Sequence, residues 1–475
     1  LPICSAYPTL SSYTTEELTR TFYDDYQWRS AAGNPLSDTY NDYFDMHFED
    51  ASTTVWPYPQ TNAVSTRLRG LVTGTRTKVL GTSTYLYAVY FYDDKGRTIQ
   101  IQTQNISGSI DISTTQYSWA GQLIVSILST SKAVPNGQTI GIATRLTYDE
   151  LGRILQIEKK LSHSQVSGGT WSDYRAISQM EYDALGNVKK KILAPGHGDG
   201  ELETLDYDYN IRAWMLGVNR AYTRDTNQEN YFGFDLGYDK TDNNLIDGQT
   251  YAAAQYNGNI SGTVWKSKGD GEKRKYDFTY DAANRITAAY FSQYTNGSFT
   301  KNAGVDFTVK NLKFDTNGNI LTMEQSGLLL AESQAIDRLK YTYSGISNRL
   351  NQVYDTANES TSKLGDFKYD AASKTATDYT YDDNGNLITD RNKGITNINY
   401  NYLNLPAVIS LKGKGVITYF YDAVGNKLRR VTVDSTGSQV RTAVTLYQGG
   451  AVYLNDTLQF LGMEEGRIRF KPGNG

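Results

Sequence analysis

Short stretches rich in β-branched and apolar residues recur along the chain, and polar turn segments separate them. The stretches "ILQIEKK" (154–160), "VKKKIL" (188–193) and "KLRRVTV" (427–433) each follow directly on a turn that contains glycine. Residues 123–128, "LIVSIL", form a short run that is apolar except for Ser126. Stretches of this kind are typical of β-strands, and the apolar run predicts a buried strand. We therefore expect an all-β fold. The apolar runs are far shorter than the ~20 residues that a membrane-spanning helix needs.

One segment near the start departs from this pattern. Residues 13–28, "YTTEELTRTFYDDYQW", carry the best helical signal in the chain, with Thr14 or Thr15 as the N-terminal cap. We expect a short helix near 13–28, inside an N-terminal segment that covers residues 1–64. This segment has three roles open to it, namely a cap, a plug or the first strands of the fold.

A six-residue phrase recurs at the ends of the predicted strands. Its consensus is an aromatic residue, Asp, two variable residues, Gly, and then Asn or Arg. The copies are "YDDKGR" (92–97), "YDELGR" (148–153), "YDALGN" (182–187), "YDAANR" (280–285), "FDTNGN" (314–319), "YDDNGN" (381–386) and "YDAVGN" (421–426). Weaker relatives are "YDYNIR" (207–212), "YDKTDN" (238–243) and "YSGISNR" (343–349).

The phrase predicts a tight turn between two strands. The aromatic residue ends one strand, Asp accepts backbone N–H groups as an Asx turn, and Gly adopts a positive φ. The next strand then leaves in the opposite direction, which makes each copy the turn of a β-hairpin. The predicted turn residues are Tyr92, Asp93, Gly96, Tyr148, Asp149, Gly152, Tyr182, Asp183, Gly186, Asp315, Gly318, Tyr381, Asp382, Gly385, Tyr421, Asp422 and Gly425.

A calcium-binding loop is the alternative interpretation of the same phrase. Such a loop needs oxygen ligands at positions 1, 3 and 5, Gly at position 6 and Glu at position 12. Counted from Asp382, Gly385 falls at position 4 and Lys393 at position 12. The copy at Asp315 fails at the same two positions, with Gly318 and Ser326. We therefore interpret the phrase as a turn and expect no metal site and no cofactor.

Composition and charge narrow the functional classes. Tyr is unusually frequent, with 38 residues against 15 Phe and 6 Trp, which suits half-buried β surfaces. The formal net charge is −4, and no basic stripe points to a nucleic-acid partner. A single cysteine, Cys4, excludes an internal disulfide.

No group of residues has the spacing of a catalytic site. His47, His163 and His197 lie in unrelated contexts, without a second His or a Cys at metal-ligand spacing. The acid pairs Asp93/Asp94 and Asp382/Asp383 fall on turns, where carboxylates are normally solvated. We therefore expect a protein that is not an enzyme.

The repeated phrase resembles the YD repeats of the RHS (rearrangement hotspot) family, which is related to toxin-complex cocoon subunits and teneurins. Two further passages are similar to the bacterial members, "LVTGTRTKVLGT" (71–82) with "YFYDDKGRTIQIQTQN" (90–105), and "YNIRAWMLGVN" (209–219). The resemblance implies β-hairpins wound into a spiral sheet that forms part of a hollow shell. It implies an RHS/YD-repeat β-shell over 65–452, and a lead-in to an RHS-associated core over 453–475.

In toxin-bearing members the shell encloses a C-terminal toxin, and a "DxxGL" motif in the core supports its release. That motif is absent here, so the cleavage activity carries over to no residue. The resemblance implies a non-enzymatic encapsulating scaffold of a secreted or cell-surface bacterial protein. The implied partners are the C-terminal core and toxin cargo of the same polypeptide, or a second chain that closes the shell, together with secretion machinery. The alternative is a cell-surface adhesion or glycan-binding β-repeat protein.

Overall fold

The computed structural model describes residues 14–469, except 199, 225–228, 240–250, 330–331, 346, 360–361 and 363–364. The chain divides into two compact units. Unit 1 comprises residues up to Ser178, together with 400–408 and 413–475, and unit 2 comprises 179–399 and 409–412.

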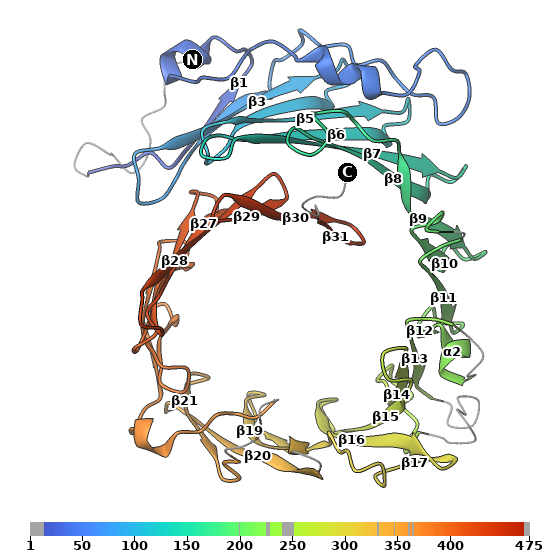
Figure 1. The fold of residues 1–475 in the computed structure, drawn as a ribbon, viewed down its shortest axis with the longest axis vertical. Helices are drawn as coiled ribbons and strands as arrows, with labels where there is room; N and C mark the ends of the chain where they lie inside the picture. The colour runs from blue at the N-terminus through green and yellow to red at the C-terminus, as the bar shows by residue number, and fades with distance from the viewer. Residues whose placement is uncertain are drawn as a thin grey trace. The chain divides into compact units, whose positions relative to one another are not determined.

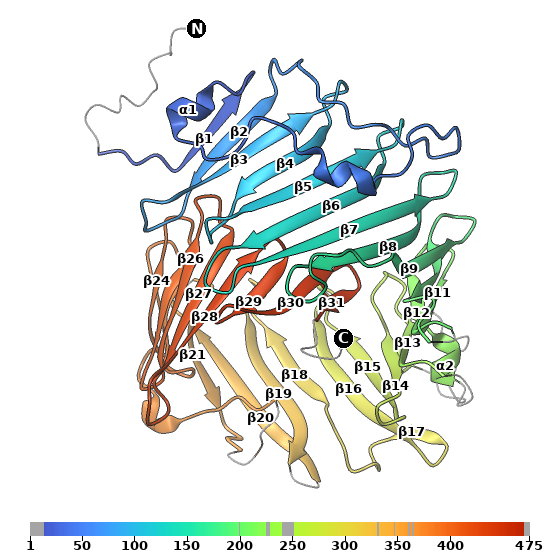
Figure 2. The ribbon, with the colours of Figure 1, turned by 45° about the horizontal axis from the view of Figure 1, so that its top comes forward.

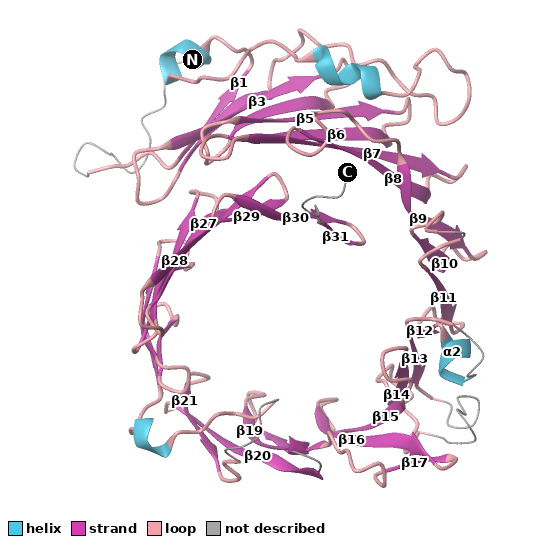
Figure 3. Cartoon of the chain, in the orientation of Figure 1, coloured by secondary structure: helices cyan, strands magenta, loops and turns pink. Residues whose placement is uncertain are grey.

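Strands dominate both units, and the few helices are short (Figure 3). The first strands are β1 (Thr19–Tyr23), β2 (Val72–Lys78), β3 (Tyr85–Tyr92), β4 (Thr98–Gln104), β5 (Ile110–Tyr117), β6 (Leu123–Lys132), β7 (Gln138–Tyr148), β8 (Ile154–His163) and β9 (Arg175–Tyr182). The next strands are β10 (Val188–Leu193), β11 (Glu203–Tyr209), β12 (Met215–Val218), β13 (Phe232–Gly237), β14 (Gly262–Ser267), β15 (Lys273–Tyr280), β16 (Ile286–Thr295), β17 (Ser298–Thr300), β18 (Val309–Phe314), β19 (Ile320–Leu329), β20 (Glu332–Tyr343) and β21 (Leu350–Asp355).

The last strands are β22 (Tyr379–Tyr381), β23 (Leu387–Asp390), β24 (Ile395–Tyr400), β25 (Pro406–Leu411), β26 (Gly415–Tyr421), β27 (Lys427–Asp434), β28 (Arg441–Gln448), β29 (Ala451–Leu454), β30 (Thr457–Met463) and β31 (Gly466–Ile468). The helices are α1 (Trp28–Ala32), the 3-10 helix η2 (Asp42–His47), α2 (Arg220–Arg224) and the 3-10 helix η3 (Ala371–Ser373). The strand β29 runs across the expected boundary at 452/453, so the segment after it continues the strand array.

Consecutive strands pair antiparallel with their sequence neighbours. In unit 1 the order β2 to β8 is unbroken, and the hairpin of β7 and β8 runs from Ile140 opposite His163 to Tyr148 opposite Ile154 (Figure 2). In unit 2 the same pattern continues from β10 to β16 and from β18 to β21. The predicted all-β fold of successive hairpins is confirmed. Neighbour-to-neighbour pairing keeps each contact local, as in repeat proteins.

The expected helix over 13–28 is wrong for the residues that the structure describes. Thr19–Tyr23 form β1, which pairs antiparallel with β2, and the first helix begins only at Trp28. Thr19 and Thr21 are β-branched and favour a strand once an edge is available for pairing. The Phe22 ring stacks on the Trp28 ring at 3.9 Å, so a local helix would lose that contact as well.

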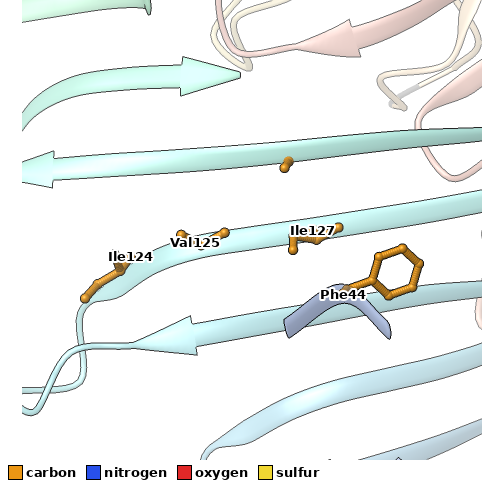
Figure 4. Packing of buried hydrophobic residues seen from close by; sticks show 5 residues of the cluster. Phe44, Ile124, Val125 and Ile127 are labelled. Carbon is orange, nitrogen blue, oxygen red and sulfur yellow. The ribbon is translucent and has the colours of Figure 1, made fainter. Parts of the chain in front are cut away.

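Residues 24–62 form a strap that lies along one face of the β2–β8 sheet (Figure 1). Phe44 of η2 packs against Val125 and Ile127 of β6, which Figure 4 shows from close by. Earlier in the strap, Leu36 is fully buried in a cluster with Phe91. Within unit 1 the described part of the N-terminal segment therefore does two things: Thr19–Tyr23 supply the first strand of the sheet, and the strap covers one face of it.

Buried glutamines hold the strap by its backbone. Gln100 of β4 accepts a hydrogen bond from the Asn41 N–H at 2.9 Å and donates one to the Asn41 carbonyl at 2.8 Å. Gln116 of β5 makes the same pair of bonds with Glu49, at 2.9 and 2.8 Å. A primary amide matches one donor and one acceptor of a peptide group, so each glutamine acts like a short piece of a neighbouring strand.

The opposite face of the β2–β8 sheet packs against the last strands of the chain. Ile140 of β7 lies in a fully buried cluster with Ala451 and Tyr453 of β29 and Leu461 of β30. We call this contact between β6–β8 and β28–β30 the seam. Strand alternation explains it, because Ile140 and Ile142 point away from the face on which Ala143 meets the strap.

Charged and polar bonds surround the apolar seam. The Lys132 ammonium, whose side chain is 2% exposed, lies 2.8 Å from an Asp456 carboxylate oxygen. Lys159 pairs with Glu464 at 3.1 Å, and the Gln448 amide donates to the Ser131 carbonyl at 2.8 Å. Both lysines are buried, and their partners Asp456 and Glu464 keep them from being unpaired charges.

Unit 2 carries a helical insertion in its hairpin array. α2 follows β12 and is tied to β13 by Asp235, which is fully buried. One oxygen of Asp235 accepts hydrogen bonds from Arg220 Nε at 2.6 Å and Arg224 Nη2 at 2.9 Å. The hydroxyl of Tyr251 reaches the other oxygen at 3.3 Å. A buried carboxylate with this many donors is satisfied, and it holds the helix to the sheet.

Candidate functional site

The recurring turn is held by several backbone and side-chain hydrogen bonds, and the copy at Asp93 illustrates it. The Asp93 N–H donates to the Arg97 carbonyl, and the Gly96 N–H donates to the Asp93 carbonyl, both at 3.0 Å. Asp93 Oδ1 accepts the backbone N–H groups of Lys95 and Arg97, each at 2.9 Å. One carboxylate therefore satisfies donors that the turn would otherwise leave to solvent.

The same two backbone bonds occur in every full copy of the phrase. They close the turns that begin at Asp149, Asp183, Asp281, Asp315, Asp382 and Asp422. The fourth residue of each turn has a positive φ, with values from 62° at Asn284 to 97° at Gly425. Asparagine tolerates this left-handed conformation better than other non-glycine residues, which explains why the copy "YDAANR" has no Gly.

The structure also explains why Asn or Arg closes the phrase. Asp93 Oδ2 accepts a bond from Arg97 Nε at 2.6 Å, and Asp149 Oδ2 accepts one from Arg153 Nε at 2.6 Å. In the asparagine copies the side-chain amide takes this place, as with Asn386 Nδ2 and Asp382 Oδ2 at 2.9 Å. Both side chains bring an N–H donor within hydrogen-bond distance of Oδ2, so either residue completes the carboxylate.

Sequence reasoning missed several copies of this turn. Asn105, Ser118 and Asn401 begin turns with the same two backbone bonds, and they carry Asn or Ser in place of Asp. The side-chain oxygen of Asn401 accepts the N–H groups of Leu403 and Leu405, as Asp does elsewhere. An alignment that allows Asp, Asn or Ser, followed three residues later by Gly or Asn, would have found them.

Two of the three weaker relatives need correction. The alignment of 207–212 as "YDYNIR" is out of phase by two residues, because the turn begins at Asn210 and Ala213 has the positive φ of 58°. The turn at 343–349 has one residue more, since the Ser344 N–H donates to the Arg349 carbonyl. The third relative, 238–243, lies largely outside the described residues.

A tyrosine that precedes many of these turns ties one hairpin to the previous one. The Tyr148 hydroxyl donates to the Leu123 carbonyl at 2.7 Å, and Leu123 is the first residue after the preceding turn. The same tie joins Tyr117 to Thr98, Tyr343 to Ile320 and Tyr381 to Leu350. It also joins Tyr92 to Val72, Tyr238 to Met215 and Tyr280 to Ile260. The hydroxyl bond explains the use of Tyr instead of Phe.

Neighbouring turns also contact each other directly. Arg97 Nη1 donates to the Ser118 carbonyl of the next turn at 2.9 Å. In unit 2, Arg285 Nη1 donates to the Asp315 carbonyl at 3.1 Å. The predicted turn residues are therefore brought together in two ways, within each turn and between consecutive turns of the same unit. The arrangement holds backbone in place and presents no nucleophile beside a base.

The turn aspartates should make the stability of the fold depend on pH. The hydrogen bond from the Asn386 side chain holds the pKa of Asp382 below its ordinary value, and Asn187 and Asn319 do the same for the pKa values of Asp183 and Asp315. An aspartate whose pKa is lower in the folded protein than in the unfolded chain stabilises the fold at pH values above its ordinary pKa. This contribution is lost as the pH falls through the folded-state pKa. We expect unfolding in urea to become easier below about pH 4.

The matched variant for this acid effect is Asp382→Asn, which keeps an acceptor oxygen but cannot titrate. Its stability should fall less than that of the unchanged chain between about pH 5 and about pH 2.5. Equal slopes for the two proteins would show that the Asp382 turn does not take part in the acid response.

A second prediction concerns the glycine of the "YDDNGN" turn. Gly385 has a φ of 87°, a conformation that β-branched residues avoid, while a Cβ there would meet only Arg349 Nη2 at 3.7 Å. The Gly385→Val variant should lose about 1–3 kcal/mol of unfolding free energy through backbone strain alone. Gly385→Asn should lose less, since Asn tolerates positive φ, and chemical denaturation of both variants would test this order.

A third prediction isolates the tyrosine tie. Tyr148→Phe removes the hydroxyl that donates to Leu123 and leaves the ring in place. We expect a loss of about 1 kcal/mol, the usual net value of one such hydrogen bond. Tyr290→Phe is the control, because Tyr290 is 43% exposed and does not precede a turn of this type. Equal effects in the two variants would remove the tie from the account of stability.

One group of carboxylates in unit 2 escaped the sequence analysis. Oxygens of Asp337, Asp355 and Asp366 lie within 4.8 Å of one another. Asp366 pairs with Lys368 at 2.6 Å, and Asp355 accepts the backbone N–H of Arg338 at 2.8 Å. Burial raises the pKa of Asp337, which accepts the Phe367 N–H at 2.8 Å. These bonds fasten the loop after β21 to β20.

Comparison with known proteins gives a coarse structural likeness. No family model matches the chain, and no curated protein sequence matches it. Among solved structures, the chain is similar to the Tc holotoxin pore of Photorhabdus luminescens with a TccC3 variant, at 13% identity and a TM-score of 0.26, over 82% of this chain and 21% of that one. It is also similar to TcdB2-TccC3-TEV, at 13% identity and a TM-score of 0.27, over 84% and 21%.

The chain thus spans about a fifth of the length of the structures that it matches. Among the residues that the structure describes, no helix has the length and apolar character needed to cross a membrane.

Proposed function

We propose that this chain is a wall segment of a secreted bacterial RHS/YD-repeat protein, and that the wall shelters a C-terminal cargo without acting on it chemically. The observation that carries the proposal is the tyrosine tie, which recurs with the aspartate turn from Tyr92 to Tyr381. The tyrosine, the aspartate and the closing Asn or Arg of the repeated phrase hold the turns and fasten hairpins to each other.

Physical arguments support a wall as the use of this array. A two-stranded hairpin alone is marginal in water, and side-by-side pairing supplies the missing stability. A continuous sheet also keeps strand edges from pairing with other chains. The strap and the seam thicken the wall in unit 1 to three layers, which makes local opening more costly there. The resemblance to YD repeats points in the same direction.

The proposed partners follow from the same function. They are the core and cargo encoded after residue 475 in the same polypeptide, or a second chain that completes the shell, with export to the cell surface or the medium. The experiment is to sequence the reading frame beyond Gly475, to purify the native protein, and to measure its intact mass and the protease resistance of the downstream region.

Two results together would support a shell. The downstream domain resists protease inside the native protein, and it is digested once a tie and a turn are weakened by Tyr148→Phe combined with Gly385→Val. A reading frame that ends close to residue 475 would contradict the proposal. So would a downstream domain that is digested equally fast in the native protein and on its own.

A further inference from the structure

The strap leaves one part of the β2–β8 sheet uncovered, and a trench of about 660 Å³ lies there. Its floor consists of side chains from β7 and β8, and its wall is the strap segment 49–59. No bond of the aspartate turns or of the seam uses this trench, so neither part of the wall accounts for it. Its two sides differ sharply in chemistry.

The part of the wall at 55–59 is apolar and carries an exposed indole. Trp56 is 37% exposed, Val55 is 68% exposed, and Pro57 and Pro59 complete this side. The Trp56 ring meets the Tyr58 ring edge-on at 6.1 Å. An aromatic face held open to solvent in this way is available for stacking against a ligand.

The wall is fixed to the sheet at its base. The Trp119 N–H donates to the Tyr58 carbonyl at 2.9 Å, and the Gln60 N–H donates to the Tyr117 carbonyl at 2.9 Å. Pro59 forms an isolated antiparallel bridge with Ser118. The segment therefore needs little ordering when a ligand binds, and this favours affinity.

The floor is polar and arranged in cross-strand pairs. Arg145 lies opposite Glu158, and Thr147 lies opposite Gln156, so the four side chains share one face. Arg145 donates to Glu158 at 2.7 Å and to Glu49 of the wall at 3.1 Å. An ion pair of this kind holds both planar groups in fixed orientations, with further hydrogen-bonding positions on each of them.

We propose that the trench binds a neutral oligosaccharide. A sugar ring has an apolar C–H face that fits the Trp56 indole, and hydroxyl groups at its rim that fit the amide, carboxylate and guanidinium groups of the floor. Glu49, Asp50 and Glu158 outnumber Arg145, which disfavours phosphates and other anions.

A basic peptide is the competing ligand, because three carboxylates line the trench. Two of them, Glu49 and Glu158, already share Arg145, and the third, Asp50, accepts the Ser52 N–H at 2.8 Å and the Ser52 hydroxyl at 2.9 Å. Arg145 already binds the first two carboxylates and Ser52 occupies the third, which favours the uncharged ligand.

The test is isothermal titration of the chain with cellohexaose, chitohexaose, maltohexaose and hexalysine, for the unchanged protein, Trp56→Ala and Trp119→Ala. Trp119 is the matched control, since its side chain is exposed and does not line the trench, and Trp119→Ala keeps the backbone N–H that binds the Tyr58 carbonyl. We expect at least one hexasaccharide to bind, with affinity reduced about tenfold or more in Trp56→Ala and unchanged in Trp119→Ala.

Thermal melting of both variants provides the check on folding, and Trp56→Phe should retain part of the affinity because it keeps an aromatic face. Binding of hexalysine alone, binding of none of the three sugars, or equal weakening by both tryptophan substitutions would overturn the proposal. The sugar site and the shell are independent, because sugar binding is measured on the wall itself and cargo protection on the region after residue 475.

Discussion

The Tyr453→Ala variant should lose about 3–5 kcal/mol of unfolding free energy, the cost of truncating a large aromatic side chain in a core. Tyr453 is 0% exposed and packs with Ile140, Ala451 and Leu461 at the seam. Removing its ring would leave a cavity between strands that lie more than 300 residues apart in the sequence. Chemical denaturation, with the seam's accessibility followed by hydrogen exchange, measures the loss and its location.

Tyr453→Phe is the informative control for this cavity. The Tyr453 hydroxyl is buried and has no hydrogen-bond partner among the described residues, and burial raises its pKa to about 12. Removing such a hydroxyl relieves a desolvation cost, so Tyr453→Phe should be neutral or slightly stabilising. A loss in Tyr453→Phe as large as that in Tyr453→Ala would show that the ring does not fill the seam.

The Asp93→Ala variant should lose about 2–4 kcal/mol, because one carboxylate satisfies several donors. Its two oxygens accept the Lys95 and Arg97 N–H groups and the Arg97 guanidinium, and the residue is only 9% exposed. Without the carboxylate, the guanidinium that also reaches the Ser118 carbonyl loses its ion pair. Equilibrium unfolding in urea measures the effect.

The neighbouring residue offers the control. Asp94 is exposed at the tip of the same turn, so Asp94→Ala should change stability by less than about 0.5 kcal/mol. Asp93→Asn should fall between the two, since it keeps one acceptor oxygen but loses the ion pair with Arg97. If Asp93→Ala and Asp94→Ala were equally stable, the turn would not depend on its carboxylate.

Local chemistry explains what was predictable. A turn of the kind at Asp382 needs an acceptor at its first residue and a positive φ at its fourth, and both demands are met within five residues of sequence. The copies at Asn105, Ser118 and Asn401 were missed, and the copy at Asn210 was placed two residues early, because several residue types satisfy the same demand. The alternation of strands and turns was likewise local, and so the all-β fold was predictable.

The N-terminal segment shows the limit of local reasoning. Thr14–Tyr23 has helical caps and charges, yet Thr19–Tyr23 forms a strand because β2 offers a free edge. The glutamines Gln100 and Gln116 look like ordinary polar strand residues until the strap backbone lies on them. Neither outcome is encoded in the segment alone, since each partner lies about 60 residues away.

By itself the sequence determined the strands that follow the repeated phrase, the hairpin turns and the positions that need Asp, Gly and Tyr, because these depend on residues that are neighbours along the chain. Only the tertiary structure decided that the Tyr148 hydroxyl reaches the Leu123 carbonyl, that Tyr453 fills the space beside Ile140, and that Trp56 lines the same trench as Arg145 and Glu158. These contacts join residues far apart in sequence, and their geometry follows from how sheets and strap pack, which no local pattern specifies.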